Sequence, residues 1–103
     1  MVLMEFSVVP LDKGASVSPY VAAVLDIVDK SGLAYCLTPM GTVVEGEWEE
    51  LSQLLDRCFH ATRAASDRIT ISVKYDYRKG QTGRLQSKIE SVENKLGRKL
   101  KTS

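Results

Sequence analysis

Two segments of the chain alternate apolar and polar residues, a pattern typical of β-strands that bury one face. The first segment covers residues 2–9 and ends before Pro10, and the second covers residues 68–77. Their apolar rows consist of Met4, Phe6 and Val8 in the first segment and Ile69, Ile71, Val73 and Tyr75 in the second. We therefore expect two long strands whose apolar rows face the helices.

Two shorter strands are expected between these segments, over residues 33–38 and 41–45. Pro39 and Met40 separate them, and Gly41 begins the second. Proline and glycine favour turns, because proline fixes φ and glycine tolerates backbone angles that other residues avoid. The two short strands should therefore pair as a β-hairpin.

Three further segments place apolar residues three and four positions apart, which predicts amphipathic helices. They cover residues 18–32, 47–65 and 85–97. Ser18 is expected to cap the first helix, with Pro19 at its first helical position. Trp48 is expected to anchor the second helix in the core, with a position beside a pocket as the alternative. Residues 98–103 are expected to fray.

The resulting order, β-α-β-β-α-β-α, predicts an α+β fold of the ferredoxin-like class. We expect one domain over residues 1–103, with an antiparallel sheet in the strand order 4-1-3-2. Two helices should cover one face of this sheet, and the last helix is an addition at the C-terminus. The second face of the sheet is then left open.

The open face is expected to be half polar. Glu5 and Ser7 of the first strand should share it with Thr70, Ser72 and Lys74 of the last strand. A carboxylate in the middle of a short, mostly apolar strand needs a partner, and Lys74 is the candidate. Such a mixed surface, with two exposed sheet edges beside it, predicts a contact with a ligand or with another subunit. We expect a homo-oligomer, and we favour a tetramer built as a dimer of dimers with two-fold symmetry over a dimer.

The composition indicates the cellular compartment and shows that charge is unevenly distributed along the chain. The chain has 103 residues, 44% of them apolar and 26% charged, with a net charge of +1. No apolar run approaches the roughly 18 residues of a membrane span, and no export signal is visible, so we expect a cytoplasmic protein. Residues 1–77 hold 6 basic and 11 acidic side chains, whereas residues 78–103 hold 8 basic and 2 acidic ones.

The residues that carry most metal and nucleophile chemistry are few. Cys36, Cys58 and His60 do not have the spacing of a zinc site, and the cysteines are expected in or near the core. His60 should lie on a solvated helix face. We therefore expect no metal, no cofactor and no catalysis.

Four segments resemble a known family of small ferredoxin-like proteins. They are MVLMEFSVVPL at the start, PMGTVVEGEWEEL, ISVKYDYRKG, and KIESVENKLG near the end. The sequence is similar along essentially its whole length to the thiamine-binding protein family, formerly described as a domain of unknown function. The resemblance implies non-catalytic binding of thiamine or its hydroxymethylpyrimidine half, and association through the sheets into dimers and tetramers.

A thiamine site on this chain would need a carboxylate for the cationic thiazolium, polar groups for the aminopyrimidine, and an apolar surface for the rings. Tyr20 or Met40 could stack on a ring. We expect the ligand on the open face or its rim, between subunits. The candidate residues are Glu5, Ser7, Met40, Gly41, Thr42, Glu45 and Lys74. In a regular strand Thr42 and Glu45 point to opposite faces, so one of them should reach the ligand only from the rim, or not at all.

Two alternatives remain at the level of sequence. One is an RNA-binding module, since the same topology serves RNA recognition and residues 78–103 are basic. It lacks the aromatic motif on the third strand, and Tyr75 and Tyr77 share the row that should face the helices. We therefore expect no nucleic-acid partner and no membrane partner. The other is a regulatory module that binds a different small molecule between subunits.

Overall fold

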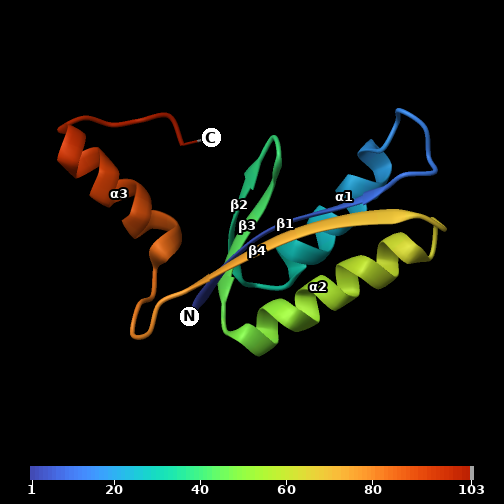
Figure 1. Ribbon diagram of the computed structural model, residues 1–103, viewed down its shortest axis with the longest axis horizontal. Coiled ribbons are helices and arrows are strands. Elements are labelled where there is room, and N and C mark those ends of the chain that lie inside the picture. Colours follow the sequence, from blue (N-terminus) through green and yellow to red (C-terminus); the bar gives the residue numbers. More distant parts are fainter. Residues whose placement is uncertain (103) are drawn as a thin grey trace.

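The computed structural model describes residues 1–102 and has the predicted element order (Figure 1). The strands are β1 (Val2–Pro10), β2 (Ala34–Thr38), β3 (Gly41–Gly46) and β4 (Ile69–Tyr77). The helices are α1 (Ser18–Lys30), α2 (Trp48–Arg63) and α3 (Arg84–Leu96). The expected bounds differ from these by one or two residues at several ends, where the periodicity of the sequence is least informative.

The four strands form one antiparallel sheet in the order β2-β3-β1-β4, which confirms the predicted topology and the ferredoxin-like fold. The registers of the long central strand β1 fix the two faces of the sheet. Phe6 lies opposite Thr42 of β3 and Val73 of β4, and Glu5 lies opposite Val43 and Lys74. Side chains of directly opposite residues point to the same face.

The core lies between the sheet and the two helices α1 and α2, which cover the same face (Figure 1). The apolar row of β1 is fully buried there, and Tyr75 of β4 packs against this core as predicted. The buried core cluster comprises Val2, Met4, Phe6, Val8, Val24, Val28, Val44, Leu51, Leu54 and Cys58. Burial of these side chains is the main stabilising contribution, at roughly 1.5–3 kcal/mol each for the larger ones.

Helices α1 and α2 differ in how their N-termini are capped. Helix α2 has the capping box that its acidic start favours: the Glu50 side chain accepts the backbone N–H of Glu47 at 2.9 Å, and the Glu47 side chain accepts the N–H of Glu50. For α1 the expected cap is wrong. Ser18 is already helical, and Val17 occupies the N-cap without a side-chain hydrogen bond.

Trp48 is not the core anchor that its size suggested. Its side chain is 51% exposed at the first residue of α2, and its ring packs on Tyr75 with 4.6 Å between the centroids. It follows the C-terminal end of β3, whereas the β2–β3 turn lies at the other end of that strand. The expectation failed because Trp48 lies in the first turn of α2, where about half of its surface stays exposed to solvent.

Helix α3 lies on the face of the sheet opposite to α1 and α2, and packs against β2 and β3 (Figure 1). Much of it extends away from the rest of the molecule, so the radius of gyration is 15.0 Å, against about 13 Å for a compact chain of 100 residues. The open face is thus covered at one end only.

The residues that follow α3 fold back onto the helix. Gly97 adopts the left-handed conformation that ends α3, and the chain turns back so that the Leu100 N–H donates to the buried Glu93 carboxylate at 2.6 Å. Ser103, the end of the segment expected to fray, lies outside the described residues. Within residues 1–102, no helix combines the length and the apolar character that crossing a membrane requires.

Candidate functional site

The central strand β1 is longer than the neighbour with which it pairs on one side. It has nine residues against six in β3, and the pairing between them stops at Phe6 and Thr42. Residues 7–10 continue past the β2–β3 turn and pair only with β4. This leaves a notch in the sheet, which we define as the space between residues 6–9 of β1 and residues 38–42 of the hairpin.

Two cavities open on the two sides of this notch. The helix-side cavity has a volume of about 150 Å³, and the open-face cavity has a volume of about 180 Å³. Phe6, Ser7 and Met40 line both of them. The other walls of the helix-side cavity are Val8, Val9, Val21, Val24, Leu25, Leu37, Thr38, Pro39, Gly41 and Thr42. The open-face cavity is completed by Glu5, Ser72, Val73 and Lys74.

The notch therefore gathers six of the seven residues that the sequence suggested. Ser7, Met40, Gly41 and Thr42 line the helix side, and Glu5 and Lys74 join Ser7 and Met40 on the open face. These residues come from three strands and a turn. Tyr20 lines neither cavity, and the Lys13 ammonium lies 6.0 Å from the centre of its ring.

The charged pair on the open-face side is unusually free. Glu5 and Lys74 are direct cross-strand partners, and both side chains are exposed. In the part of the chain that the structure describes, neither side chain takes part in a hydrogen bond or an ion pair. A carboxylate and an ammonium on the rim of one cavity are thus available to a ligand.

The helix-side cavity is mostly apolar, and its hydroxyl groups come from Ser7, Thr38 and Thr42. Thr42 is only 5% exposed, and its side chain has no hydrogen bond to any residue from 1 to 102. Thr42 therefore offers a donor and an acceptor to a molecule in this cavity.

The turn that closes the notch is held in a defined shape by Thr38. Its hydroxyl donates to the Gly41 carbonyl at 2.9 Å and accepts the Met40 N–H at 3.3 Å. Gly41 sits so close to β1 that an added Cβ would lie 3.0 Å from the Phe6 carbonyl oxygen. Met40 is 90% exposed at the tip, where its flexible side chain can cover either cavity.

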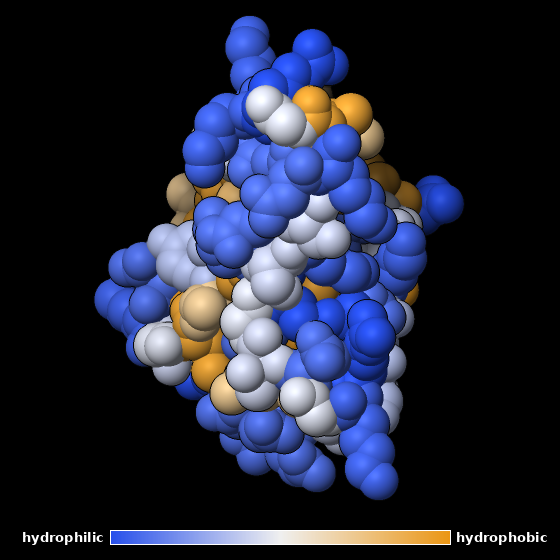
Figure 2. All heavy atoms as spheres, turned by 90° about the vertical axis from the view of Figure 1, so that its left-hand side faces the viewer, coloured by the Kyte–Doolittle hydropathy of each residue, from blue (hydrophilic) through white to orange (hydrophobic). Residues whose placement is uncertain are grey.

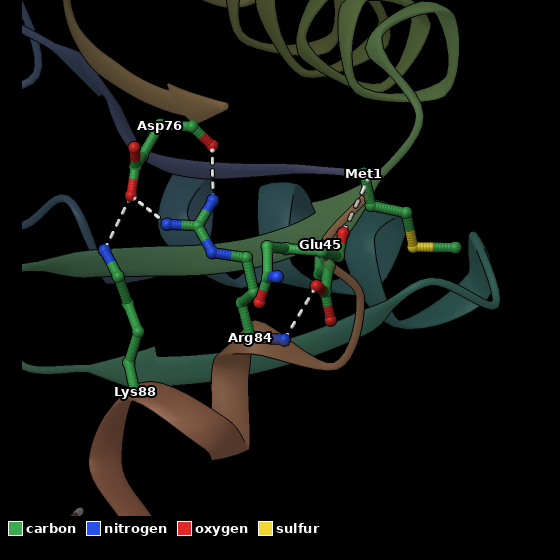
Figure 3. Close-up of polar contacts among 6 residues, drawn as sticks. Met1, Glu45, Asp76, Arg84 and Lys88 are labelled. Carbon is green, nitrogen blue, oxygen red and sulfur yellow. Dashed lines mark hydrogen bonds and ion pairs between the residues drawn. The ribbon is translucent and has the colours of Figure 1, made fainter. Parts of the chain in front are cut away.

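Glu45 lies apart from this group, at the far end of β3. It points to the open face, as Thr42 points to the helix face, so the two do diverge as their spacing required. The Glu45 carboxylate is buried beneath α3 and accepts the backbone N–H of Arg84 at 2.8 Å (Figure 3). This contact supports the start of α3, where a negative charge is favourable.

Asp76 completes the attachment of α3. Its carboxylate is paired with the Arg84 guanidinium and accepts a hydrogen bond from the Lys88 ammonium at 2.6 Å (Figure 3). The hydrogen bonds from Lys88 and from Arg84 hold the pKa of Asp76 below its usual range. Sequence reasoning missed this cluster, because Asp76 belongs to β4 whereas Arg84 and Lys88 belong to α3, and the packing of α3 on the sheet brings them together.

Cys58 and His60, which were considered for metal binding and catalysis, lie outside the notch. Cys58 is fully buried, and burial raises the pKa of its thiol to about 11. His60 is exposed on α2, as expected, with Asp56 at 3.3 Å. No group of three or more His, Cys, Asp or Glu side chains within residues 1–102 could hold a metal ion.

Comparison with known proteins agrees with this architecture. A UPF0045 protein of Synechocystis sp. is 34% identical over 96 residues, which is 92% of this chain and 79% of the relative. Another, from Methanocaldococcus jannaschii, is 33% identical over 88% of this chain and 91% of its own length. The crystal structure of a hypothetical protein from that archaeon matches with a TM-score of 0.83, covering 88% of this chain and 94% of the other.

A more distant structure shares the fold. It is a Thermotoga maritima protein, provisionally described as a thiamine biosynthesis/salvage protein, with a TM-score of 0.77 at 22% identity over 88% of this chain and 97% of the other. The family model for thiamine-binding proteins matches residues 4–93. This match includes most of β1, the other three strands and most of α3. The chain therefore belongs to the thiamine-binding protein family.

Proposed function

We propose that the protein binds thiamine, or its hydroxymethylpyrimidine half, in the notch and does not transform it. The observation that carries this proposal is the free Glu5 carboxylate beside two cavities that share Phe6, Ser7 and Met40. Membership of the thiamine-binding family supports the identity of the ligand. The chemistry of the notch supports the way in which the ligand is held.

Each part of thiamine has a counterpart in the notch. The thiazolium is a cation, and the open-face cavity is lined by the Glu5 carboxylate. The aminopyrimidine carries donors and acceptors, which the hydroxyl groups of Ser7 and Thr42 can satisfy. Met40 supplies a polarizable side chain for stacking on a ring. Few polar groups in a mostly apolar pocket are the usual arrangement for small-molecule recognition.

The absence of turnover is part of the proposal. The notch offers carboxylate, hydroxyl, ammonium and thioether groups, and Ser7 and Thr42 have no histidine beside them to act as a base among its lining residues. Binding without reaction fits a protein that stores, delivers or senses its ligand.

The proposal includes self-association through the sheet. Strand β4 is a free edge of nine residues, and its core-side residues Ile71 and Val73 are 39% and 41% exposed in the single chain. Such an edge favours pairing with another copy, in a cytoplasmic homodimer or homotetramer. The alternative function, RNA binding, is less well supported, because Tyr75 and Tyr77 lie on the helix side of β4 and not on the open face.

The test is a calorimetric titration of the full chain with thiamine. We expect saturable binding with one ligand per notch, and weaker binding of the neutral hydroxyethylthiazole half, which lacks the cation. A titration with hydroxymethylpyrimidine alone then tells which half dominates. No heat with thiamine or with hydroxymethylpyrimidine, confirmed by equilibrium dialysis, would refute the proposal.

A further inference from the structure

A second and larger groove lies between α3 and the open face of the sheet. Its volume is about 560 Å³, within the range of about 300–1,000 Å³ that is common for ligand sites. Its lining residues are Leu3, Cys36, Thr38, Pro39, Val43, Arg84, Leu85, Lys88, Ile89, Lys101 and Thr102. We call it the α3 groove. It shares Thr38 and Pro39 with the helix-side cavity of the notch, but lies on the other side of the hairpin.

The walls of the α3 groove are apolar. Leu3 and Val43 form its floor on the sheet, and Leu85 and Ile89 face them from α3. Seen from the side of α3, polar atoms surround smaller apolar patches (Figure 2). An apolar floor with a polar margin suits the body of a small organic molecule, whose burial there removes both surfaces from water.

The margin of the groove carries an excess of positive charge. Arg84, Lys88 and Lys101 line it, against the nearby carboxylates of Asp76 and Glu45, which are bound to α3 residues. Lys101 is brought there by the folded-back C-terminal tail. Its side chain makes no hydrogen bond or ion pair with residues 1–102, so it is available to a ligand.

The charge around the α3 groove favours a small anion over a second copy of the chain as its occupant. Residues 78–103 hold 8 basic and 2 acidic side chains, and a two-fold contact would bring two such basic segments together. Like charges at close range disfavour that contact, whereas an anion is attracted. We propose that the α3 groove binds a small amphipathic anion, with an apolar body on Leu3, Val43, Leu85 and Ile89 and its acidic head at Lys101.

This site is independent of the thiamine proposal, and its test uses the fluorescent anion 8-anilinonaphthalene-1-sulfonate. We expect one saturable site per chain, with affinity about five-fold lower in Lys101→Gln, the upper range for one exposed charge pair. Lys79→Gln, which removes a lysine outside the groove, is the matched control and should bind like wild type. The neutral probe N-phenyl-1-naphthylamine should bind both variants equally.

A pair of α3 variants tests the groove wall. Ile89→Glu places a carboxylate on the wall and should lower the affinity for the anion at least about ten-fold. Gln86→Glu adds the same charge to the exposed face of α3 and should have a small effect. Equal affinities in all four variants and wild type, or displacement of the anion by thiamine, would overturn the inference of a separate site.

Alkylation of Cys36 gives a readout that does not depend on the probe's fluorescence. Cys36 lines the groove, whereas Cys58 is buried with a pKa of about 11 and should not react at neutral pH. Decanoate or decyl phosphate in the groove should slow iodoacetamide, decanol less so, and the two acids distinguish a carboxylate from a phosphate head. Rates that fall with protein concentration but not with these ligands would assign the groove to a second copy and overturn the proposal.

Discussion

Glu5 and Lys74 lie directly opposite each other on β1 and β4, on the open face of the sheet, and no ion pair joins them. Opposite charges at such positions commonly stabilise a sheet by roughly 0.2–1 kcal/mol. Their separation leaves a carboxylate and an ammonium at the rim of the notch. Five predictions follow from this arrangement and from the contacts around it.

The first concerns the charge that meets the ligand. Glu5→Gln keeps the shape of the side chain and removes its negative charge, so thiamine should bind about ten-fold more weakly, or about 1.4 kcal/mol. Lys74→Gln removes a like charge from the surroundings of the cation, so affinity should stay equal or rise. Calorimetry measures both. Unchanged affinity in Glu5→Gln would exclude Glu5 from the site.

The second concerns the narrow contact between the hairpin and β1. Gly41→Ala would place a Cβ 3.0 Å from the Phe6 carbonyl oxygen, so we expect the free energy of unfolding to fall by about 1–3 kcal/mol. Gly46→Ala, on the same strand, meets only side-chain atoms at 3.4 Å or more and should change it by less than about 1 kcal/mol. Urea denaturation followed by circular dichroism compares them. Equal losses would contradict the close approach.

The third concerns α3 and pH. The pKa of Asp76 is lowered from its usual 3.8 by hydrogen bonds from Lys88 and Arg84. Its contribution to the attachment of α3 is therefore complete above the usual pKa and is lost as pH falls through the lower, folded-state value. In NMR spectra recorded from pH 7 down to about pH 2, amide signals of α3 should change before those of β1.

Variants separate this effect from general acid unfolding. Asp76→Asn should reproduce the acid-state signals of α3 at pH 7. Asp56→Asn, which removes the exposed partner of His60 on α2, is the control and should leave α3 unchanged. If α3 keeps its native signals in Asp76→Asn, then Asp76 does not hold the helix.

The fourth concerns Trp48, the single tryptophan. It packs on Tyr75 at the start of α2 and lines neither cavity of the notch. Saturation with thiamine should therefore leave the wavelength of its emission maximum unchanged, whereas unfolding should shift it to the red. A saturable shift with ligand would place the binding site near α2 and against the notch.

The fifth concerns assembly. Ile71→Lys puts a charge on the exposed core side of the free edge strand β4, a substitution that natural edge strands use to prevent pairing. Light scattering should show a dimer or tetramer for wild type and a smaller species for the variant. Gln53→Lys, on an exposed position of α2, should assemble like wild type. A wild-type monomer at micromolar concentration would contradict the proposed assembly.

The periodicity of the sequence determined the elements and the sheet. Alternation in β1 and β4 indicated which rows of side chains face the helices. Because crossover connections are right-handed, the element order then left essentially one strand order for the sheet. Local chemistry was less reliable at the helix ends. Ser18 had the right side chain for a cap, but the helix begins one residue earlier and includes it.

For the site, the sequence indicated Glu5, Ser7, Met40, Gly41, Thr42 and Lys74, because polar or turn residues in short strands stand out from a binary pattern. It also required Thr42 and Glu45 to face opposite ways. It could not tell which of them faces the helices, since alternation fixes relative and not absolute orientation. The register pairs Thr42 with Phe6, and therefore Thr42 faces the helices and Glu45 faces the open side.

Only the tertiary structure produced the notch and the attachment of α3. The notch exists because β1 continues past the point where the hairpin turns, which depends on how two strands align and not on either strand alone. Glu45 meets the Arg84 N–H across 39 positions of the chain. Contacts between residues so distant in sequence leave no local pattern, because they form only when whole strands and helices pack together.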